Sequence, residues 1–198
     1  MKKEFITAVL LLALGSAGNV VAANPPQGKS DQQKPTFAGV YDHLLTGLEH
    51  EIVPAAEAMP DDKYNFAPPA TAGEFKGVRT FADEVKHIAG ANYMFGAAIL
   101  GEKPPAEAGG EDGPSKLTSK ADIMKYLNGS FAYLHKAMNS VNENNILEEL
   151  PPPFGTHKMT RLAIATIALA HPQDHYGQMV VYLRMNGIVP PASRGSGM

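Results

Sequence analysis

The sequence contains no cysteine and no tryptophan. The absence of cysteine excludes disulfide bonds, thiolate metal sites, cysteine nucleophiles and acylation as a lipoprotein. The seven histidines are therefore the side chains best suited to metal binding or proton transfer in this chain.

The chain also lacks an excess of charge of either sign. Its 17 Lys and Arg residues against 20 Asp and Glu residues give a net charge of −3. Binding to nucleic acid requires clustered basic side chains, so we expect no nucleic-acid partner. A composition of 44% hydrophobic and 19% charged residues is typical of a globular protein.

Long hydrophobic runs are scarce, and the clearest one lies near the N-terminus. Lys2 and Lys3 precede an apolar run over residues 6–14, and Ala23 ends a small-x-small motif. This pattern is typical of a secretory signal peptide, and the run is too short to span a bilayer comfortably. We expect cleavage after Ala23, export to the periplasm or the extracellular space, and no membrane association of the mature chain.

The remaining chain is predicted to form one all-α domain over residues 36–192, between a flexible leader (24–35) and a disordered tail (193–198). No segment alternates as a strand does. Apolar residues at helical spacing predict four helices, over about 36–59, 79–100, 119–141 and 157–185. Four such helices imply a four-helix bundle, and its long connections allow a parallel pair of neighbours.

Two details of the helices can be predicted. Pro54 should kink or restart the first helix, and Pro172 should kink the fourth. The side chains of the first helix that should face the core are spaced by four, and they are Val40, Leu44, Leu48 and Ile52.

His171 and His175 are the most informative pair of residues. Their i, i+4 spacing places both side chains on one face of the fourth helix, where they can share an ion. His87 is the best third ligand because it lies on an inward face of the second helix, beside the small Ala91. The alternative is that these are ordinary half-buried, hydrogen-bonded histidines without a metal.

Other polar residues could complete such a site. His50 could serve as a fourth ligand or a proton-transfer group. Glu84 could act as a base, or could orient His87 through a hydrogen bond. Gln178 continues the face that carries the histidine pair. His135 and His157 show no partner in the pattern and are expected at the surface.

Two common metal motifs are not met. The zinc-protease pattern H-E-x-x-H fails because Pro172 and Gln173 follow His171. The Glu-x-x-His pattern of di-iron bundles occurs at Glu84 and His87, but its required second copy is missing.

Three stretches together resemble the DinB superfamily, and they occur in that family's order within about residues 36–193. They are residues 59–66 (MPDDKYNF), residues 81–93 around His87-Ile88-Ala89-Gly90, and residues 171–191 with HxxxHYGQ, VYLR and GIVPP. The resemblance implies an up-down-down-up bundle. It also implies a three-histidine site for a divalent metal, with one ligand from the second helix and two from the fourth. These positions correspond to His87, His171 and His175.

The resemblance also bears on activity, because characterised relatives include thiol-S-transferases that use bacillithiol or mycothiol. We therefore expect an exported protein that binds one divalent transition metal, with zinc or nickel favoured. It would act as a hydrolase or thiol-S-transferase on a small molecule that the sequence does not identify. The alternative is a non-catalytic metal- or ligand-binding or structural module, and pairing as a homodimer remains open.

Overall fold

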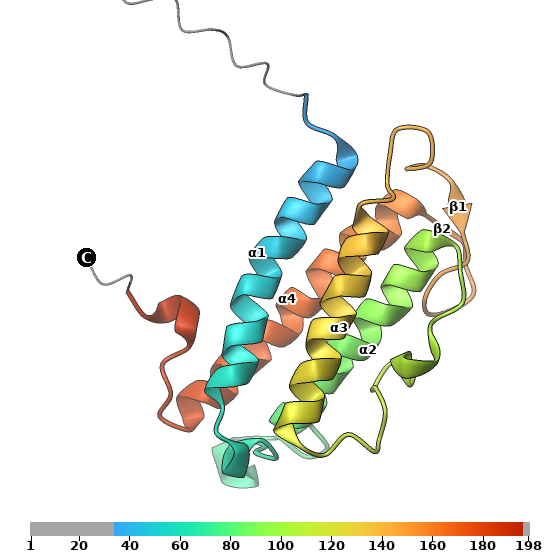
Figure 1. Cartoon of the computed structure of the whole chain (residues 1–198). Coiled ribbons are helices and arrows are strands. Elements are labelled where there is room, and N and C mark those ends of the chain that lie inside the picture. Colours follow the sequence, from blue (N-terminus) through green and yellow to red (C-terminus); the bar gives the residue numbers. More distant parts are fainter. Residues whose placement is uncertain (1–33, 196–198) are drawn as a thin grey trace, which may run out of the picture. The chain divides into compact units, whose positions relative to one another are not determined.

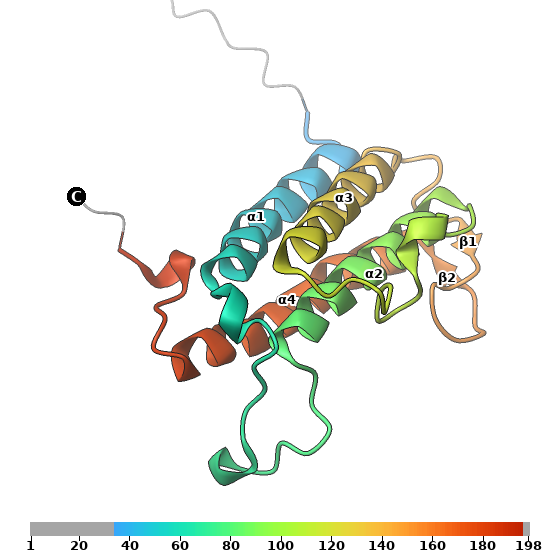
Figure 2. The same cartoon turned by 60° about the horizontal axis from the view of Figure 1, so that its bottom comes forward.

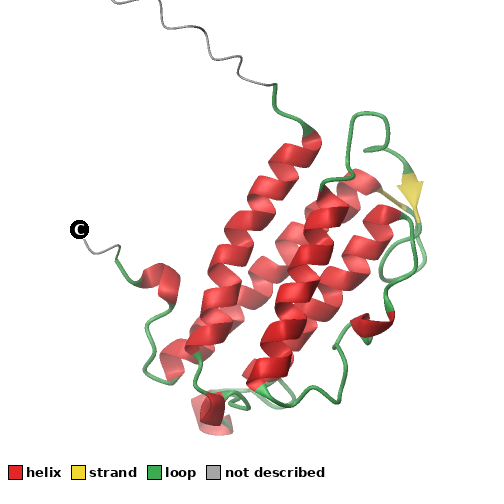
Figure 3. Cartoon of the chain, viewed as in Figure 1, coloured by secondary structure: helices red, strands yellow, loops and turns green. Residues whose placement is uncertain are grey.

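The computed structural model describes residues 34–195, so the predicted signal peptide and most of the predicted leader lie outside the described residues. Helices dominate the described part of the chain (Figures 1 and 3). The four long ones are α1 (Phe37–Ala58), α2 (Phe81–Leu100), α3 (Lys120–Met138) and α4 (Arg161–Met185). The predicted four-helix bundle is confirmed.

The helices follow an up-down-down-up order. In Figure 1, α2 runs opposite to α1, and α3 then runs in the same direction as α2 because residues 101–119 lead the chain back along the bundle. Each of α1 and α2 packs against both α3 and α4. Figure 2 shows the same arrangement from another side. The antiparallel pair formed by α2 and α4 therefore brings their facing side chains together.

Side-chain caps fix where each long helix begins. Thr36, Thr80, Ser119 and Thr160 each accept a hydrogen bond from the backbone N–H three residues further on. Such caps satisfy amides that have no partner inside the helix. Helix α4 starts at Arg161, later than predicted, because the preceding residues pair as strands.

A two-stranded antiparallel pair joins α3 to α4, where we predicted no strand. It consists of β1 (Glu149–Leu150) and β2 (Met159–Thr160). Two residues per strand are too few to produce a recognisable alternation in the sequence. Short 3-10 turns complete the connections, at Asp61–Lys63, Ala70–Ala72, Ala106–Ala108 and Pro191–Ser193.

The buried face of α1 differs from the prediction in its first half. Leu48 and Ile52 are buried as predicted, but Val40 and Leu44 are exposed, and Leu45 takes the core position instead. Residues spaced strictly by four rotate by about 40° per step around a helix, so such a row leaves the core face after a few turns. Residues spaced alternately by three and four positions, such as Leu45, Leu48 and Ile52, stay on the core face.

Neither internal proline ends its helix. Helix α1 continues through Pro54 to Ala58, so the predicted restart is wrong, and α4 continues through Pro172. Proline removes one helical amide donor. At Pro54 the carbonyl that loses this donor belongs to the exposed residue His50, where water can replace it.

The core lies between the helices and contains the predicted apolar faces of α2 and α3. Its largest fully buried side chains include Phe81, Ile88, Phe131 and Leu134. After α4, Arg184 Nη2 donates to Ser193 Oγ over 3.1 Å, and residues 196–198 of the predicted tail lie outside the described residues. Among residues 34–195, no helix combines the length and the apolar character needed to cross a membrane.

Candidate metal centre

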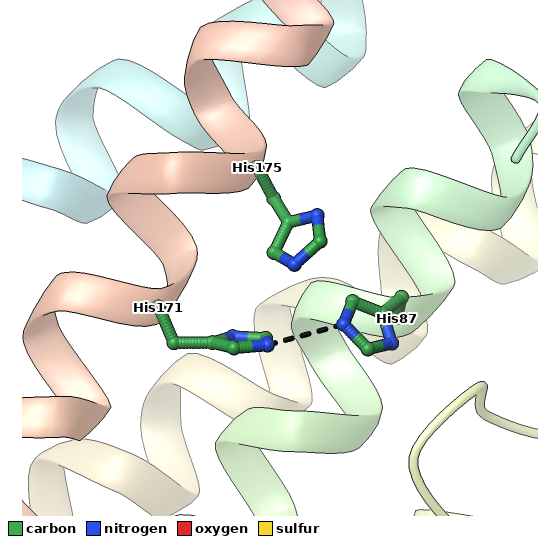
Figure 4. A group of neighbouring side chains, drawn as sticks. All are labelled: His87, His171 and His175. Atoms are coloured by element: carbon green, nitrogen blue, oxygen red, sulfur yellow. Dashed lines mark hydrogen bonds between the residues drawn. The ribbon is translucent and has the colours of Figure 1, made fainter. Parts of the chain in front are cut away.

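Three histidine side chains converge between α2 and α4. His87 comes from α2, and His171 and His175 come from successive turns of α4 (Figure 4). Each ring offers a nitrogen atom within 4.8 Å of those of the other two. The structure thus brings together the three residues that the sequence predicted as metal ligands.

Packing of the two helices places this cluster at the edge of the core. Val85 and Ile88 are fully buried on either side of His87, which is 2% exposed. His175 is also buried, whereas His171 is half-buried. The cluster is therefore held on rigid helices, and it is screened from most of the solvent.

The spacing of two of the donors fits a shared metal ion. Nε2 of His87 and Nε2 of His171 are 3.1 Å apart. Two nitrogen atoms bound to one zinc ion at its usual bond length lie about 2.8–3.4 Å apart in octahedral or tetrahedral arrangements. Three imidazole nitrogens are a donor set that zinc and nickel accept.

The cluster also contains unsatisfied polar atoms. Nδ1 of His87 and Nδ1 of His171 are buried without a hydrogen-bond partner among the described residues. Buried polar atoms of this kind are uncommon and often mark functional sites.

Glu84 orients one of the three histidines. Nδ1 of His175 donates to Oε2 of Glu84 over 2.6 Å, and Glu84 is 2% exposed. This hydrogen bond keeps a proton on Nδ1 of His175 and leaves the lone pair on Nε2. The partner of Glu84 is therefore His175 and not His87, the partner expected from the sequence.

Gln178 lies at the rim of the cluster. Its Nε2 atom is 3.4 Å from Nδ1 of His175 and 3.5 Å from Oδ2 of Asp174. Both distances are long for hydrogen bonds. The Gln178 side chain therefore lies beside the three histidines and is not one of the candidate metal ligands.

The electrostatics of the cluster favour neutral imidazoles. Burial, and then the neighbouring His175 and His87, lower the pKa of His171 to about 4. Burial, followed by Arg79 and His175, also lowers the pKa of His87. Both rings are therefore uncharged at neutral pH, which is the form that binds metals.

An open pocket of about 720 Å³ lies beside residues that contact the cluster, although none of the three histidines lines it. Its polar lining includes Arg79, Asp83, Glu84, Lys86, Asp112 and Gln178. The charges in it are largely paired with each other. Lys86 contacts Asp83 and Arg79 contacts Asp112, each over 2.9 Å.

The other four histidines lie outside the cluster, and His43 among them is exposed on α1. His50, a candidate fourth ligand, is exposed on α1 and does not join the other three. His157 is exposed as predicted. His135 was expected at the surface without a partner, and that prediction is wrong. Its half-buried ring contacts Asp42 Oδ1 at 2.7 Å and Glu49 Oε2 at 3.1 Å.

Two residues near the cluster were missed by the sequence analysis. Asp112, from the connection between α2 and α3, places Oδ1 3.4 Å from Nδ1 of His87, and Arg79 binds the same carboxylate. The position of a loop residue depends on tertiary contacts of the loop, so no local pattern could have indicated Asp112.

The fold and the cluster together define this chain as a four-helix bundle with three histidines between α2 and α4. The model of the DinB superfamily matches residues 44–179. Because the match covers more than half of the chain, the chain belongs to the DinB superfamily.

Solved structures agree with this fold. A DinB-like protein from Bacillus subtilis is similar with a TM-score of 0.57 and 18% identity, over 75% of this chain and 92% of that chain. A DinB-like protein from Bacillus cereus gives a TM-score of 0.63 and 15% identity, over 79% of this chain and 96% of that one. At such identities the likeness supports the fold alone. The comparison with curated proteins gives no match.

Proposed function

We propose that this chain binds one divalent transition metal ion, with zinc or nickel favoured, through His87, His171 and His175. The convergence of their ring nitrogens within 4.8 Å carries this proposal. The 2.6 Å hydrogen bond from His175 to Glu84 adds the carboxylate partner that metal-binding histidines usually have.

We propose further that the site acts on a small molecule by hydrolysis or thiol transfer. A divalent ion supplies a Lewis acid for such reactions and lowers the pKa of water or thiol. Three protein ligands leave positions free, and the pocket of about 720 Å³ offers room beside them. Arg79 and Lys86 line this pocket and could hold an anionic part of a substrate.

One observation favours the alternative of a binding module without turnover. The three carboxylates of the pocket are engaged, Asp83 by Lys86, Glu84 by His175 and Asp112 by Arg79. A general base needs an unpaired basic atom within hydrogen-bond reach of the substrate proton that it removes. Both proposals include the bound metal ion, and they differ in whether the site catalyses a reaction.

The decisive first experiment is to measure the metal content of the untagged protein purified without chelator. We expect nearly one divalent ion per chain, and loss of this ion when His87, His171 and His175 are all replaced by alanine. His157→Ala, an exposed histidine, is the matched control and should retain the metal. Equal metal contents in all three proteins, after incubation with zinc or nickel, would contradict the proposal.

If the ion is found, activity can be tested on the same preparations. Thiol-transfer assays with bacillithiol and mycothiol, together with a panel of ester and amide substrates, should show turnover that the triple variant lacks. A metal-loaded protein without turnover on any of them would favour the binding module.

We also propose that the protein is exported after cleavage behind Ala23. The charged start and apolar run of residues 2–14 support this. Expression of the full chain in a bacterial host should yield a protein whose N-terminal residue is Asn24, in the periplasm or the medium. Cytoplasmic protein that still begins at residue 1 would contradict export.

A further inference from the structure

The loop that connects α2 to α3 brings a carboxylate to His87. Asp112 Oδ1 lies 3.4 Å from Nδ1 of His87, a nitrogen with no hydrogen-bond partner among residues 34–195. We propose that Asp112 is the positioning residue of His87. Its carboxylate keeps the proton on Nδ1 and leaves the Nε2 lone pair directed towards His171.

This inference deepens the proposed metal site and rests on it. His175 already has such a partner in Glu84, which is buried on α2. With Asp112, two of the three histidines would each have a carboxylate behind the nitrogen that faces away from the cluster. In metal sites these outer hydrogen bonds fix the ring orientation and raise the basicity of the ligand.

The loop is anchored where this contact requires it. A Cβ atom on Gly90 of α2 would lie 2.5 Å from the carbonyl oxygen of Gly110 and 2.6 Å from that of Glu111. The lack of a side chain at Gly90 therefore allows the loop backbone to lie directly on the helix. On its other side, the hydroxyl of Tyr126 in α3 donates to the carbonyl of Ala108.

Arg79 fixes the carboxylate itself. Its Nη2 and Nε atoms donate to Oδ1 of Asp112, over 2.9 and 3.3 Å. The backbone of Arg79 is held in turn by Tyr182 of α4, whose hydroxyl donates to the Arg79 carbonyl over 3.0 Å. Asp112 is thus tied to the start of α2 and, through Tyr182, to the helix that carries the other two histidines.

The expected effect on metal affinity is modest, because the Asp112 side chain is 76% exposed and water competes for it. Loss of an outer-shell partner usually weakens metal binding by about 10–100-fold, and we expect the lower end of this range. The matched control is Glu111→Gln at the neighbouring exposed position, because the Glu111 carboxylate acts on His87 only through its charge and forms no ion pair with it among the described residues.

The test compares the full wild-type chain with Asp112→Asn and Glu111→Gln by two measurements. The first is the dissociation constant for zinc, from competition with a chromophoric chelator. The second is the tautomer of His87 in the metal-free proteins, from the ¹⁵N shifts of its ring at pH 8. Circular dichroism checks that each variant is folded, which substitution of these exposed side chains should not disturb.

We expect Asp112→Asn to weaken zinc binding about tenfold and to move the His87 proton from Nδ1 towards Nε2, while Glu111→Gln changes neither. Unchanged affinity and tautomer in Asp112→Asn would overturn the inference. Equal weakening in both variants would also overturn it, since the effect would then be one of net charge. A wild type that binds no zinc would overturn the proposed metal site instead, and the tautomer would still decide whether Asp112 holds His87.

Discussion

Nδ1 of His175 and Oε2 of Glu84 are 2.6 Å apart, and both side chains are buried. Such a short contact between an imidazole N–H and a carboxylate is a strong hydrogen bond. It gives the buried carboxylate of Glu84 the hydrogen-bond donor that burial of a charged group requires. It also fixes which nitrogen of His175 is free to face His87 and His171.

Removal of the negative charge at Glu84 should weaken metal binding. We expect Glu84→Gln to raise the zinc dissociation constant by about 10–100-fold, because the amide is a poorer acceptor for His175 Nδ1. Chelator competition measures this change. Glu74→Gln, an exposed carboxylate in the connection between α1 and α2, should bind zinc as the wild type does. Unchanged affinity in Glu84→Gln would show that the hydrogen bond does not support the ligand.

The lowered pKa of His171 predicts acid sensitivity of the metal-free protein. The pKa is about 4 in the folded chain and about 6.5 in an unfolded one, so the unfolded chain binds more protons between these values. The free energy of unfolding should therefore fall as the pH decreases from 6.5 to 4. We expect a smaller fall for His171→Gln, measured by urea denaturation in the presence of chelator. Parallel curves for the two proteins would contradict the shift.

The sequence was sufficient to predict the three histidines because each lies on a helix. The spacing of His171 and His175 fixes their common face, and the small neighbours of His87 mark an inward face of α2. It was insufficient wherever position depends on contacts between distant segments. Asp112 reaches His87 through a loop packed on Gly90, and His135 meets Asp42 from 93 positions away. The helical period shows which residues share one face of a helix. It does not show which residues of another element pack against that face.

His135 should stabilise the fold without taking part in metal binding. It joins α3 to α1 through Asp42 and Glu49, and each hydrogen bond to a charged group contributes about 1.5–3 kcal/mol, less when part-exposed. We expect His135→Ala to lower the free energy of unfolding by about 1–2 kcal/mol and to retain the metal. Urea denaturation and metal analysis test both points. His157→Ala, which removes an exposed histidine, should change neither, and loss of metal in His135→Ala would contradict the assignment.

Arg161 should be a sensitive position outside the histidine cluster. Its buried guanidinium donates to the carbonyls of Ile99 and Asn145 and to the carboxylate of Glu148 over 2.6 Å. Removal of the side chain would leave these acceptors without their donor. We expect Arg161→Ala to cost about 2–4 kcal/mol of unfolding free energy.

Urea denaturation measures this loss. Lys158→Ala, which removes an exposed cation close by in the sequence, serves as the control and should lie within about 0.5 kcal/mol of the wild type. An Arg161→Ala protein as stable as this control would show that the connection between α3 and α4 does not depend on the guanidinium.

His87 and His171 are 84 positions apart in the chain, and their Nε2 atoms are 3.1 Å apart. A metal ion bound by both histidines would cross-link the chain, which has no cysteine with which to form a disulfide. Closing so long a loop restricts the unfolded chain much more than it restricts the folded bundle. The same three nitrogens that would bind the ion would then also brace α2 against α4. If the chain is exported as proposed, the metal would supply the reinforcement that exported proteins commonly obtain from disulfides.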